Sequence, residues 1–191
     1  MASAFALLAA LASADAFAAS SSNTTLPADS VYQLTLPLTD QAGRVSDWRT
    51  RRGKPQLVSM FYTSCQYVCP LIVDSGKAIE SQLTPSQRNR LGILLVSMDP
   101  ARDTPTALAS VVAKRKLDTS HWTLASPPAG SVREVAGLLG IRFRPLADGE
   151  FNHTSALILL DPEGRVLART EQIGTRPDPE FLSAVRKAAG P

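Results

Sequence analysis

The chain has 191 residues, of which 44% are hydrophobic, 19% charged and 6% aromatic. This composition lies within the range of globular proteins and excludes a disordered or collagen-like chain. Twenty Lys and Arg residues against 17 Asp and Glu residues give a net charge of +3, without a long basic run. A dedicated nucleic-acid-binding protein carries a denser basic patch, so we expect no nucleic acid among the partners. The length predicts one domain with a tail.

The first 18 residues have the composition of a secretory signal peptide. They are rich in Ala, Leu, Phe and Ser, contain no Lys or Arg, and end in small residues that fit an Ala-x-Ala cleavage pattern. Their apolar stretch is shorter than the ~20 residues that a membrane-spanning helix needs. We therefore predict a signal peptide over residues 1–18 and a flexible polar spacer over residues 19–30. The protein is then periplasmic or otherwise exported, either soluble after cleavage or tethered by its N-terminus.

Strand and helix signals alternate from Val31 onward. Residues 31–38 have the composition of a strand, and the turn-forming residues 40–43 end it. Short apolar runs at residues 56–62 and 91–96 are typical of buried strands. Helical patterns are expected in four places: residues 70–83, a short helix from Pro85, residues 105–116 and residues 131–139.

The C-terminal part of the chain predicts a hairpin followed by a helix. Residues 156–160 and 166–170 have strand composition, with a turn sequence over residues 161–164 between them, and residues 179–189 form an amphipathic helical pattern. This order predicts an α/β fold with a central mixed sheet flanked by helices and an extra N-terminal strand or hairpin. No internal repeat is present, so residues 31–191 are predicted to form one domain.

Both cysteines follow the first buried strand, at Cys65 and Cys69. In a helix this spacing places two side chains on one face, with Cβ atoms ~5–6 Å apart, so the sulfurs can meet. A helix N-terminus favours negative charge, so we expect a lowered pKa for a cysteine in the first turn. Thiolates attack disulfides and bind soft metals, and a structural disulfide is a third interpretation, although so short a loop would add little stability. Redox chemistry and metal binding both stay open.

A third ligand would separate these interpretations, and the chain has two histidines. His121 follows a polar loop, so we expect it to be a surface or packing residue. His153 directly precedes the predicted strand 156–160. A residue at the start of a strand can face the end of a neighbouring strand, where Cys65 lies. On spacing alone, His153 is equally consistent with a ligand and with a capped loop residue.

Three motifs together resemble the Sco/SenC family. They are Phe61-Tyr62-Thr63-Ser64-Cys65 with Val68-Cys69-Pro70, then Ser97-Met98-Asp99-Pro100-Ala101-Arg102-Asp103-Thr104-Pro105, and finally His153 followed by a strand and Asp161-Pro162-Glu163-Gly164. The resemblance extends from about residue 30 to residue 190. Members of this family have a thioredoxin-like fold and handle copper during the assembly of cytochrome c oxidase. The resemblance therefore implies that fold, and it implies Cys65, Cys69 and His153 as copper ligands.

The chain departs from the family pattern in two places near these ligands. The family usually has Cys-Pro-x-x-Cys-Pro, often with an acidic residue inside it, whereas this chain has Gln66 and Tyr67. An acidic residue usually precedes the histidine, and here Phe151 and Asn152 stand in its place. Such changes keep the three ligands but alter the residues around them, which tune metal affinity and redox potential.

The predicted ligand set agrees with copper chemistry. Two thiolates and one imidazole suit Cu(I), and the same set holds Cu(II) when a further weak ligand is available. A structural zinc site needs four protein ligands, and the chain has no third cysteine. Met60 and Met98 are candidate thioether ligands, but their positions in or at the end of a strand favour core packing. Oxidation of the two thiols to a disulfide would release the metal.

The motif over residues 97–105 has a structural and a functional interpretation. Asp103 or Thr104 can cap the helix that Pro105 begins. Alternatively, Asp99, Arg102 and Asp103 can form a charged docking surface beside the cysteines. We expect the structural role.

Three functions are compatible with these residues. The first is an exported copper-binding protein that delivers copper to, or maintains the thiols of, the binuclear copper site during oxidase assembly. The second is a thioredoxin-like thiol-disulfide reductase or redox sensor that uses Cys65 and Cys69. The third is a peroxidase-like thiol enzyme, which gives no reason for Cys69 and His153 to occur together. We expect a monomeric copper chaperone rather than an enzyme, with an oxidase subunit as the recipient and other copper chaperones or thioredoxin-like proteins as further partners.

Overall fold

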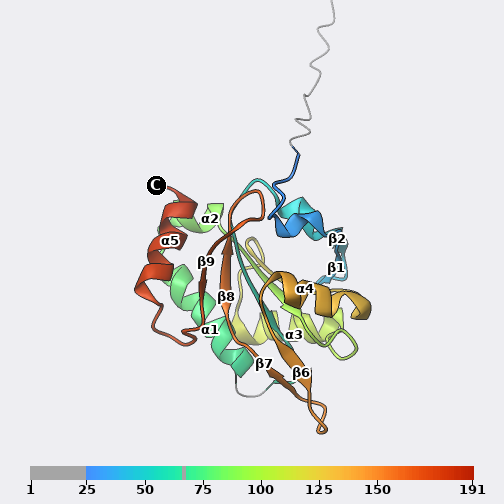
Figure 1. The fold of residues 1–191 in the computed structure, drawn as a ribbon. Coiled ribbons are helices and arrows are strands. Elements are labelled where there is room, and N and C mark those ends of the chain that lie inside the picture. Colours follow the sequence, from blue (N-terminus) through green and yellow to red (C-terminus); the bar gives the residue numbers. More distant parts are fainter. Residues whose placement is uncertain (1–24, 66–67) are drawn as a thin grey trace, which may run out of the picture.

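The computed structural model describes residues 25–65 and 68–191 (Figure 1). The predicted signal peptide, the first half of the predicted spacer, and Gln66 and Tyr67 lie outside the described residues. Within the described part of the chain, seven strands form one mixed sheet in the order β2-β1-β5-β4-β3-β8-β9, and a separate hairpin pairs β6 with β7. The strands are β1 (Pro37–Asp40), β2 (Val45–Asp47), β3 (Gln56–Phe61), β4 (Gly92–Ser97), β5 (Trp122–Ser126), β6 (Phe143–Pro145), β7 (Phe151–His153), β8 (Leu157–Leu160) and β9 (Val166–Thr170).

Helices cover the sheet, which confirms the predicted α/β class. They are α1 (Val68–Ser81), α2 (Pro85–Arg90), α3 (Pro105–Arg115), α4 (Val132–Leu138) and α5 (Pro179–Ala189), with short 3-10 helices at Val31–Gln33, Trp48–Arg51 and Ala129–Ser131. Helix α1 packs against β3, α3 against β5 and β1, and α5 against β9. Figure 1 shows α1, α2 and α5 grouped on one side of the molecule. No helix of the described residues is both long and apolar enough to cross a membrane.

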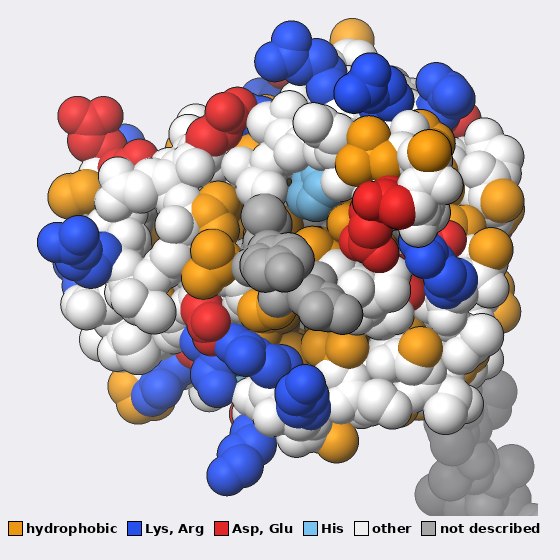
Figure 2. Space-filling view, turned by 90° about the horizontal axis from the view of Figure 1, so that it is seen from below, with side chains coloured by type: hydrophobic (Ala, Val, Ile, Leu, Met, Phe, Trp, Pro, Cys, Tyr) orange, Lys and Arg blue, Asp and Glu red, His pale blue; other side chains and the backbone are white. Residues whose placement is uncertain are grey.

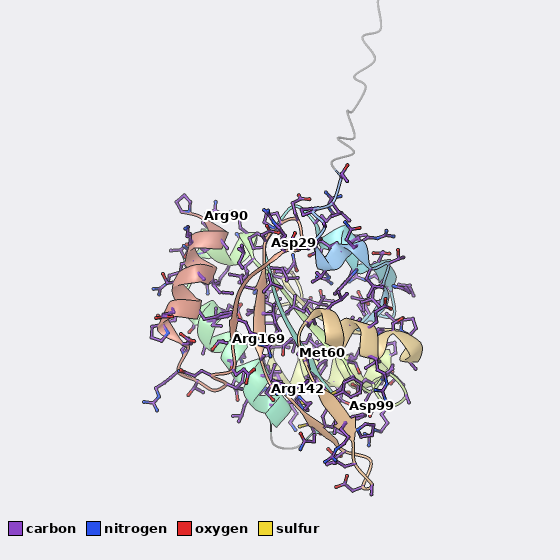
Figure 3. All side chains as sticks on the ribbon, in the orientation of Figure 1. Asp29, Met60, Arg90, Asp99, Arg142 and Arg169 are labelled. Carbon is purple, nitrogen blue, oxygen red and sulfur yellow. The ribbon has the colours of Figure 1, made fainter. Side chains whose placement is uncertain are left out.

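The central strands β3, β4 and β5 run parallel, and every residue of β3 and β4 is buried. Parallel strands covered on both faces need apolar side chains throughout, which explains the continuous apolar runs in the sequence. Met60, in the centre of the molecule in Figure 3, and Met98 are both buried in the core. Their predicted packing role is confirmed.

The two hairpins of the main sheet share one turn sequence, Asp-x-x-Gly-Arg. Asp40 accepts hydrogen bonds from the backbone N–H and the guanidinium of Arg44, at 3.0 and 2.9 Å. Asp161 accepts the equivalent bonds from Arg165, at 2.9 and 2.7 Å. In the second turn Gly164 has a φ of 84°, and a Cβ there would lie 2.4 Å from a core aromatic carbon. The turn therefore requires glycine, and the predicted turns at residues 40–43 and 161–164 are confirmed.

The predicted strand over residues 31–38 is wrong in its first half. Residues Val31–Gln33 form a 3-10 helix, and the strand begins only at Pro37. The side chain of Ser30 accepts a hydrogen bond from the backbone N–H of Tyr32, which starts the helical turn. This local cap outweighs the strand composition. Because Ser30 is itself buried, the folded domain extends into the predicted spacer.

Strands β5, β6 and β7 are absent from the sequence-based assignment. In β5, Trp122 and Leu124 are buried, a period of two that a strand requires. Between β6 and β7 lies the dipeptide Asp148-Gly149, which is a strong hairpin signal, and Gly149 has a φ of 83°. Both signals are present in the sequence.

Candidate metal centre

The sheet topology brings the cysteines and His153 to one edge of the molecule. Cys65 follows the carboxyl end of β3. Strand β8 runs antiparallel to β3, with Val58 opposite Ile158, so the beginning of β8 lies at that same end. His153 is the last residue of β7, with three residues between it and the start of β8, and Figure 1 shows the start of α1 and the β6–β7 hairpin at the same lower edge. Figure 2 views this edge from below, with a histidine and several hydrophobic side chains near its centre.

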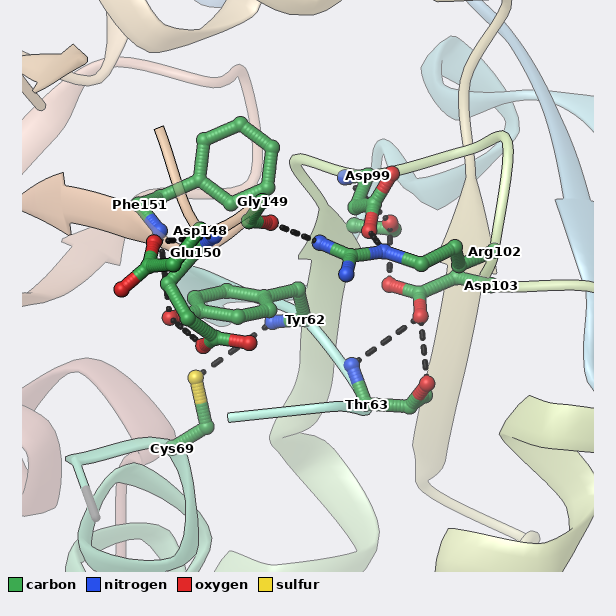
Figure 4. A network of polar contacts seen from close by, with 11 residues as sticks. Tyr62, Thr63, Cys69, Asp99, Arg102, Asp103, Asp148, Gly149, Glu150 and Phe151 are labelled. Atoms are coloured by element: carbon green, nitrogen blue, oxygen red, sulfur yellow. Dashed lines mark hydrogen bonds and ion pairs between the residues drawn. The ribbon is translucent and has the colours of Figure 1, made fainter. Parts of the chain in front are cut away.

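The two cysteines are neighbours. The backbone N–H of Cys69 donates a hydrogen bond to the Sγ atom of Cys65 at 3.3 Å. The backbone N–H of Tyr62 donates to the Sγ atom of Cys69 at 3.4 Å (Figure 4). Cys69 is only 3% exposed, whereas Cys65 is half-buried. A partner or a metal ion therefore reaches Cys65 first.

The expected lowering of a thiol pKa is wrong for Cys69. Helix α1 begins at Val68, so Cys69 lies in its first turn, while Cys65 precedes the helix. Burial nevertheless raises the pKa of the Cys69 thiol, and the hydrogen bond from the Tyr62 N–H opposes this only in part. Desolvation outweighs the helix N-terminus because almost no water reaches the sulfur. Burial therefore favours the neutral thiol at Cys69.

Tyr62 lies between the thiols and the hairpin. Its hydroxyl donates a hydrogen bond to the carboxylate of Glu150 at 2.8 Å (Figure 4). Burial raises the pKa of Tyr62, as do the Glu150 carboxylate and a hydrogen bond with Cys65. The Tyr62 ring packs edge-to-face against Phe151 and His153, with centroids 5.1 and 5.8 Å away. One side chain thus contacts both the cysteine loop and the histidine hairpin.

His153 lies on strand β7, opposite Phe143, so the capped loop residue that the sequence left open as one alternative is wrong. Strand β7 has only three residues and pairs only with β6, so the sequence shows no alternating apolar pattern that would predict it. The Nδ1 atom of His153 lies 3.2 Å from the carbonyl oxygen of Thr154. Since a carbonyl only accepts, Nδ1 carries the proton and Nε2 keeps its lone pair. Burial lowers the pKa of His153, so its neutral, ligating form prevails.

The donor atoms suit a soft metal ion, but the structure does not gather them. Among residues 25–65 and 68–191, no group of three or more His, Cys, Asp or Glu side chains is arranged to hold a metal ion. Cys65 and Cys69 line one cleft, whereas His153 lines a separate hollow with Arg142 and Glu171. Two adjacent thiols and a neutral imidazole fit copper by their chemistry. That they form one site stays a prediction.

Asp103 links the carboxyl end of β3 to the carboxyl end of β4. Its buried carboxylate accepts hydrogen bonds from the backbone N–H and the hydroxyl of Thr63, at 3.0 and 2.5 Å, and from the Ser97 hydroxyl at 2.5 Å (Figure 4). Thr104 caps α3 by accepting a hydrogen bond from the backbone N–H of Ala107. The predicted structural role of the motif is therefore confirmed. The link from Asp103 to Thr63 joins residues 40 positions apart, which no local pattern reveals.

Arg102 connects the same motif to the hairpin. Its guanidinium contacts the carboxylate of Asp99 and the backbone carbonyl oxygen of Gly149 (Figure 4). The other histidine of the chain, His121, precedes β5 at the opposite edge of the sheet. Its Nε2 atom lies 2.5 Å from the Oε1 atom of Glu80. Its side chain is 8% exposed, which confirms the expected packing role.

The fold and the site define a thioredoxin-like α/β protein with two neighbouring thiols at the carboxyl edge of its sheet. Residues 26–189 match the SCO1/SenC family model, so the chain belongs to this family. A protein of Stutzerimonas stutzeri that has been proposed to bind copper is 26% identical over 136 residues, which cover 68% of this chain and 64% of that protein. The SCO1 protein homolog of Bacillus subtilis (strain 168) is 22% identical over 153 residues, covering 78% of this chain and 79% of that protein.

Solved structures share the fold at low sequence identity. The SCO1/SenC family lipoprotein from Bacillus anthracis has a TM-score of 0.73 and 21% identity, covering 82% of this chain and 94% of that one. ScoI of Bradyrhizobium japonicum, solved with copper bound, has a TM-score of 0.63 and 24% identity, covering 81% and 98%. BsSco, a Sco-family cytochrome c oxidase assembly protein in which a disulfide switch was identified, has a TM-score of 0.68 and 22% identity, covering 82% and 92%. These likenesses confirm the predicted fold.

Proposed function

We propose that this chain binds copper through Cys65, Cys69 and His153, and that it delivers copper to, or maintains the thiols of, the binuclear copper site during cytochrome c oxidase assembly. The observation that carries the proposal is the pair of adjacent thiols, with a histidine whose Nε2 lone pair is available at the same edge of the sheet. Soft thiolate ligands select Cu(I).

The relatives support this proposal. ScoI of Bradyrhizobium japonicum was solved with copper bound, and BsSco belongs to a family of cytochrome c oxidase assembly proteins. The relative from Bacillus anthracis is a lipoprotein, which agrees with an exported protein. We place this chain in the periplasm or an equivalent exported compartment, with residues 1–18 as its signal peptide and the copper-receiving oxidase subunit as its partner.

Copper is the cargo of this proposed reaction, and the two thiols differ in how they take it. Cys65 is the more exposed sulfur and makes the first contact. Cys69 keeps its proton until the metal displaces it, because burial raises its pKa. His153 loses no side-chain proton on binding, because its Nε2 lone pair is already available. It joins the thiols when the β6–β7 hairpin shifts past Tyr62.

A thiol-disulfide reductase is the second candidate, and the unequal exposure of the thiols favours it. An exposed Cys65 can attack a substrate disulfide, and the buried Cys69 can then attack the mixed disulfide from within. This reaction needs no imidazole, so His153 separates the two functions.

The test is a Cu(I) titration of the reduced protein against a competing chelator, run beside a disulfide-reduction assay. His153→Ala should weaken copper binding by at least about tenfold and leave the reduction rate unchanged. His121→Ala, at the opposite edge of the sheet, is the matched control and should change neither property. Wild-type copper affinity in His153→Ala would remove the copper-delivery proposal and leave the reductase.

A further inference from the structure

Beside Cys65 the molecule has a cleft with mixed polar and apolar walls and a basic rim, and we propose that it receives an acidic peptide segment of the protein that exchanges copper or thiols with this chain. The cleft has a volume of about 620 Å³ and lies between the start of α1 and the last turn of α3. Cys65 and Cys69 both line it. The proposal rests on the proposed function, because it names the partner chemistry for the same two thiols.

The size and walls of the cleft suit a short peptide. Pockets of ~300–1,000 Å³ enclose a small molecule or a few residues, and this volume falls within that range. Its walls include Phe61, Val73 and Val111. Walls that are part polar and part apolar favour a ligand with both kinds of group, such as a peptide, over a free inorganic anion.

The charged residues of the cleft favour a negatively charged peptide. Both charged side chains among its described lining residues, Lys114 and Arg115, are cations. Lys114 is exposed, and the Nζ atom of Lys77 donates a hydrogen bond to the backbone carbonyl of Arg115 on the same rim. A single carboxylate, that of Asp74, contacts the Arg115 guanidinium. Figure 2 shows Lys and Arg side chains gathered on this face of the molecule.

Two buried polar atoms at the cleft lack a partner in the described structure. They are the Oγ atom of Ser64 and the Nε atom of Arg115. A buried donor without an acceptor destabilises a protein by ~1–3 kcal/mol, so such groups usually mark a missing partner. An arginine Nε–H only donates, and a serine hydroxyl can donate as well. Both atoms are enclosed by the protein, so the group that the cleft offers to a carboxylate of the peptide is the exposed ammonium of Lys114.

The experiment follows thiol-disulfide exchange between the reduced, copper-free protein and two peptide disulfides. One is the disulfide dimer of Ac-Gly-Glu-Cys-Glu-Gly-amide, and the other has Gln in place of each Glu. The Cys65 thiolate attacks one peptide sulfur, which forms a mixed disulfide and releases one peptide as a thiolate. The Cys69 thiolate then attacks the Cys65 sulfur and releases the second peptide. The protein loses two electrons, the peptide disulfide gains them, and the two thiol protons pass to the released peptide thiolates.

We expect the acidic peptide to react about tenfold faster than the neutral one at low ionic strength, and the preference to shrink with added salt. Lys114→Gln should reduce this preference by about threefold or more and leave the neutral rate unchanged. Lys187→Gln on α5 makes the same change in net charge away from the cleft and is the matched control. Equal rates for the two peptides, no exchange with either, or equal effects of the two lysine variants would overturn the proposal.

A parallel copper titration keeps this proposal separate from the proposed function. Lys114 is not among the proposed ligands, so Lys114→Gln should bind Cu(I) like the wild type while it loses preference for the acidic peptide. Absence of copper binding in the wild type would contradict the proposed function alone, since the exchange assay contains no metal. A loss of copper affinity in Lys114→Gln would overturn the assignment of Lys114 to partner binding.

Discussion

The two halves of the candidate site differ in how firmly they are held. The cysteine loop leaves the buried strand β3, and Asp103 holds it at Thr63 through two hydrogen bonds while a third joins Asp103 to Ser97 at the end of β4. The β6–β7 hairpin that carries His153 has no buried residue in either strand. Tyr62 contacts it through hydrogen bonds with Glu150 and the Phe151 N–H and through aromatic packing, and Arg102 of the 97–105 motif contacts Gly149.

This contrast indicates which half moves when the three predicted ligands meet. Local opening requires the least free energy where few apolar contacts are buried, and the hairpin meets that condition. We therefore expect the thiols to stay in place and the hairpin to bring the imidazole to them. Variants that loosen either half should therefore have different effects.

The largest expected effect comes from the buried thiol. Cys69→Ser replaces a soft sulfur ligand by a hydroxyl that binds Cu(I) poorly, so copper affinity should fall by more than about a hundredfold. Chelator competition on the reduced protein measures this change, and circular dichroism checks the fold. Retention of copper affinity within threefold of the wild type would place the copper site elsewhere.

A stability effect should follow from loosening the cysteine loop. Asp103→Ala leaves the Thr63 and Ser97 donors without their acceptor, so the free energy of unfolding should fall by about 2 kcal/mol or more. Urea denaturation measures the change. Asp29→Ala, at an exposed position, is the control and should stay within about 0.5 kcal/mol of the wild type. Equal small effects of both variants would mean that Asp103 does not fasten the loop.

A smaller effect is expected on the hairpin side. Tyr62→Phe keeps the ring packing and removes only the hydroxyl that donates to Glu150. The free energy of unfolding should fall by about 1 kcal/mol, and copper affinity should be kept or increased, because the hairpin moves more freely. Urea denaturation and chelator competition test the two parts. A tenfold loss of copper affinity would show that the hydroxyl supports the metal site directly.

The smallest expected effect is a pH dependence from His153. Burial holds its pKa below the ordinary histidine value of 6.5, so the unfolded chain binds a proton that the native protein does not. The free energy of unfolding therefore decreases as pH falls from about 7 toward 5. Urea midpoints for the copper-free wild type and His153→Gln measure this effect. The wild type should lose more stability than the variant, and an equal or steeper loss in the variant would contradict a buried, neutral His153.

Local patterns reveal much of this molecule and its site. The continuous apolar runs predict β3 and β4, Thr104-Pro105 predicts the start of α3, and the Cys65–Cys69 spacing predicts adjacent sulfurs. Long-range contacts are the part that sequence reasoning misses. The burial that raises the Cys69 pKa is one example, and the placement of Tyr62 against Glu150, 88 positions away, is another. Both depend on which strands pair, which no single segment encodes.

X-ray absorption spectroscopy of the Cu(I)-loaded protein tests most directly whether the two halves meet on one metal ion. The account predicts two sulfur ligands and one nitrogen ligand in the wild type, and loss of the nitrogen in His153→Ala with both sulfurs kept. A wild-type spectrum with sulfur ligands alone, unchanged in His153→Ala, would show that the hairpin never delivers its imidazole and would contradict the account.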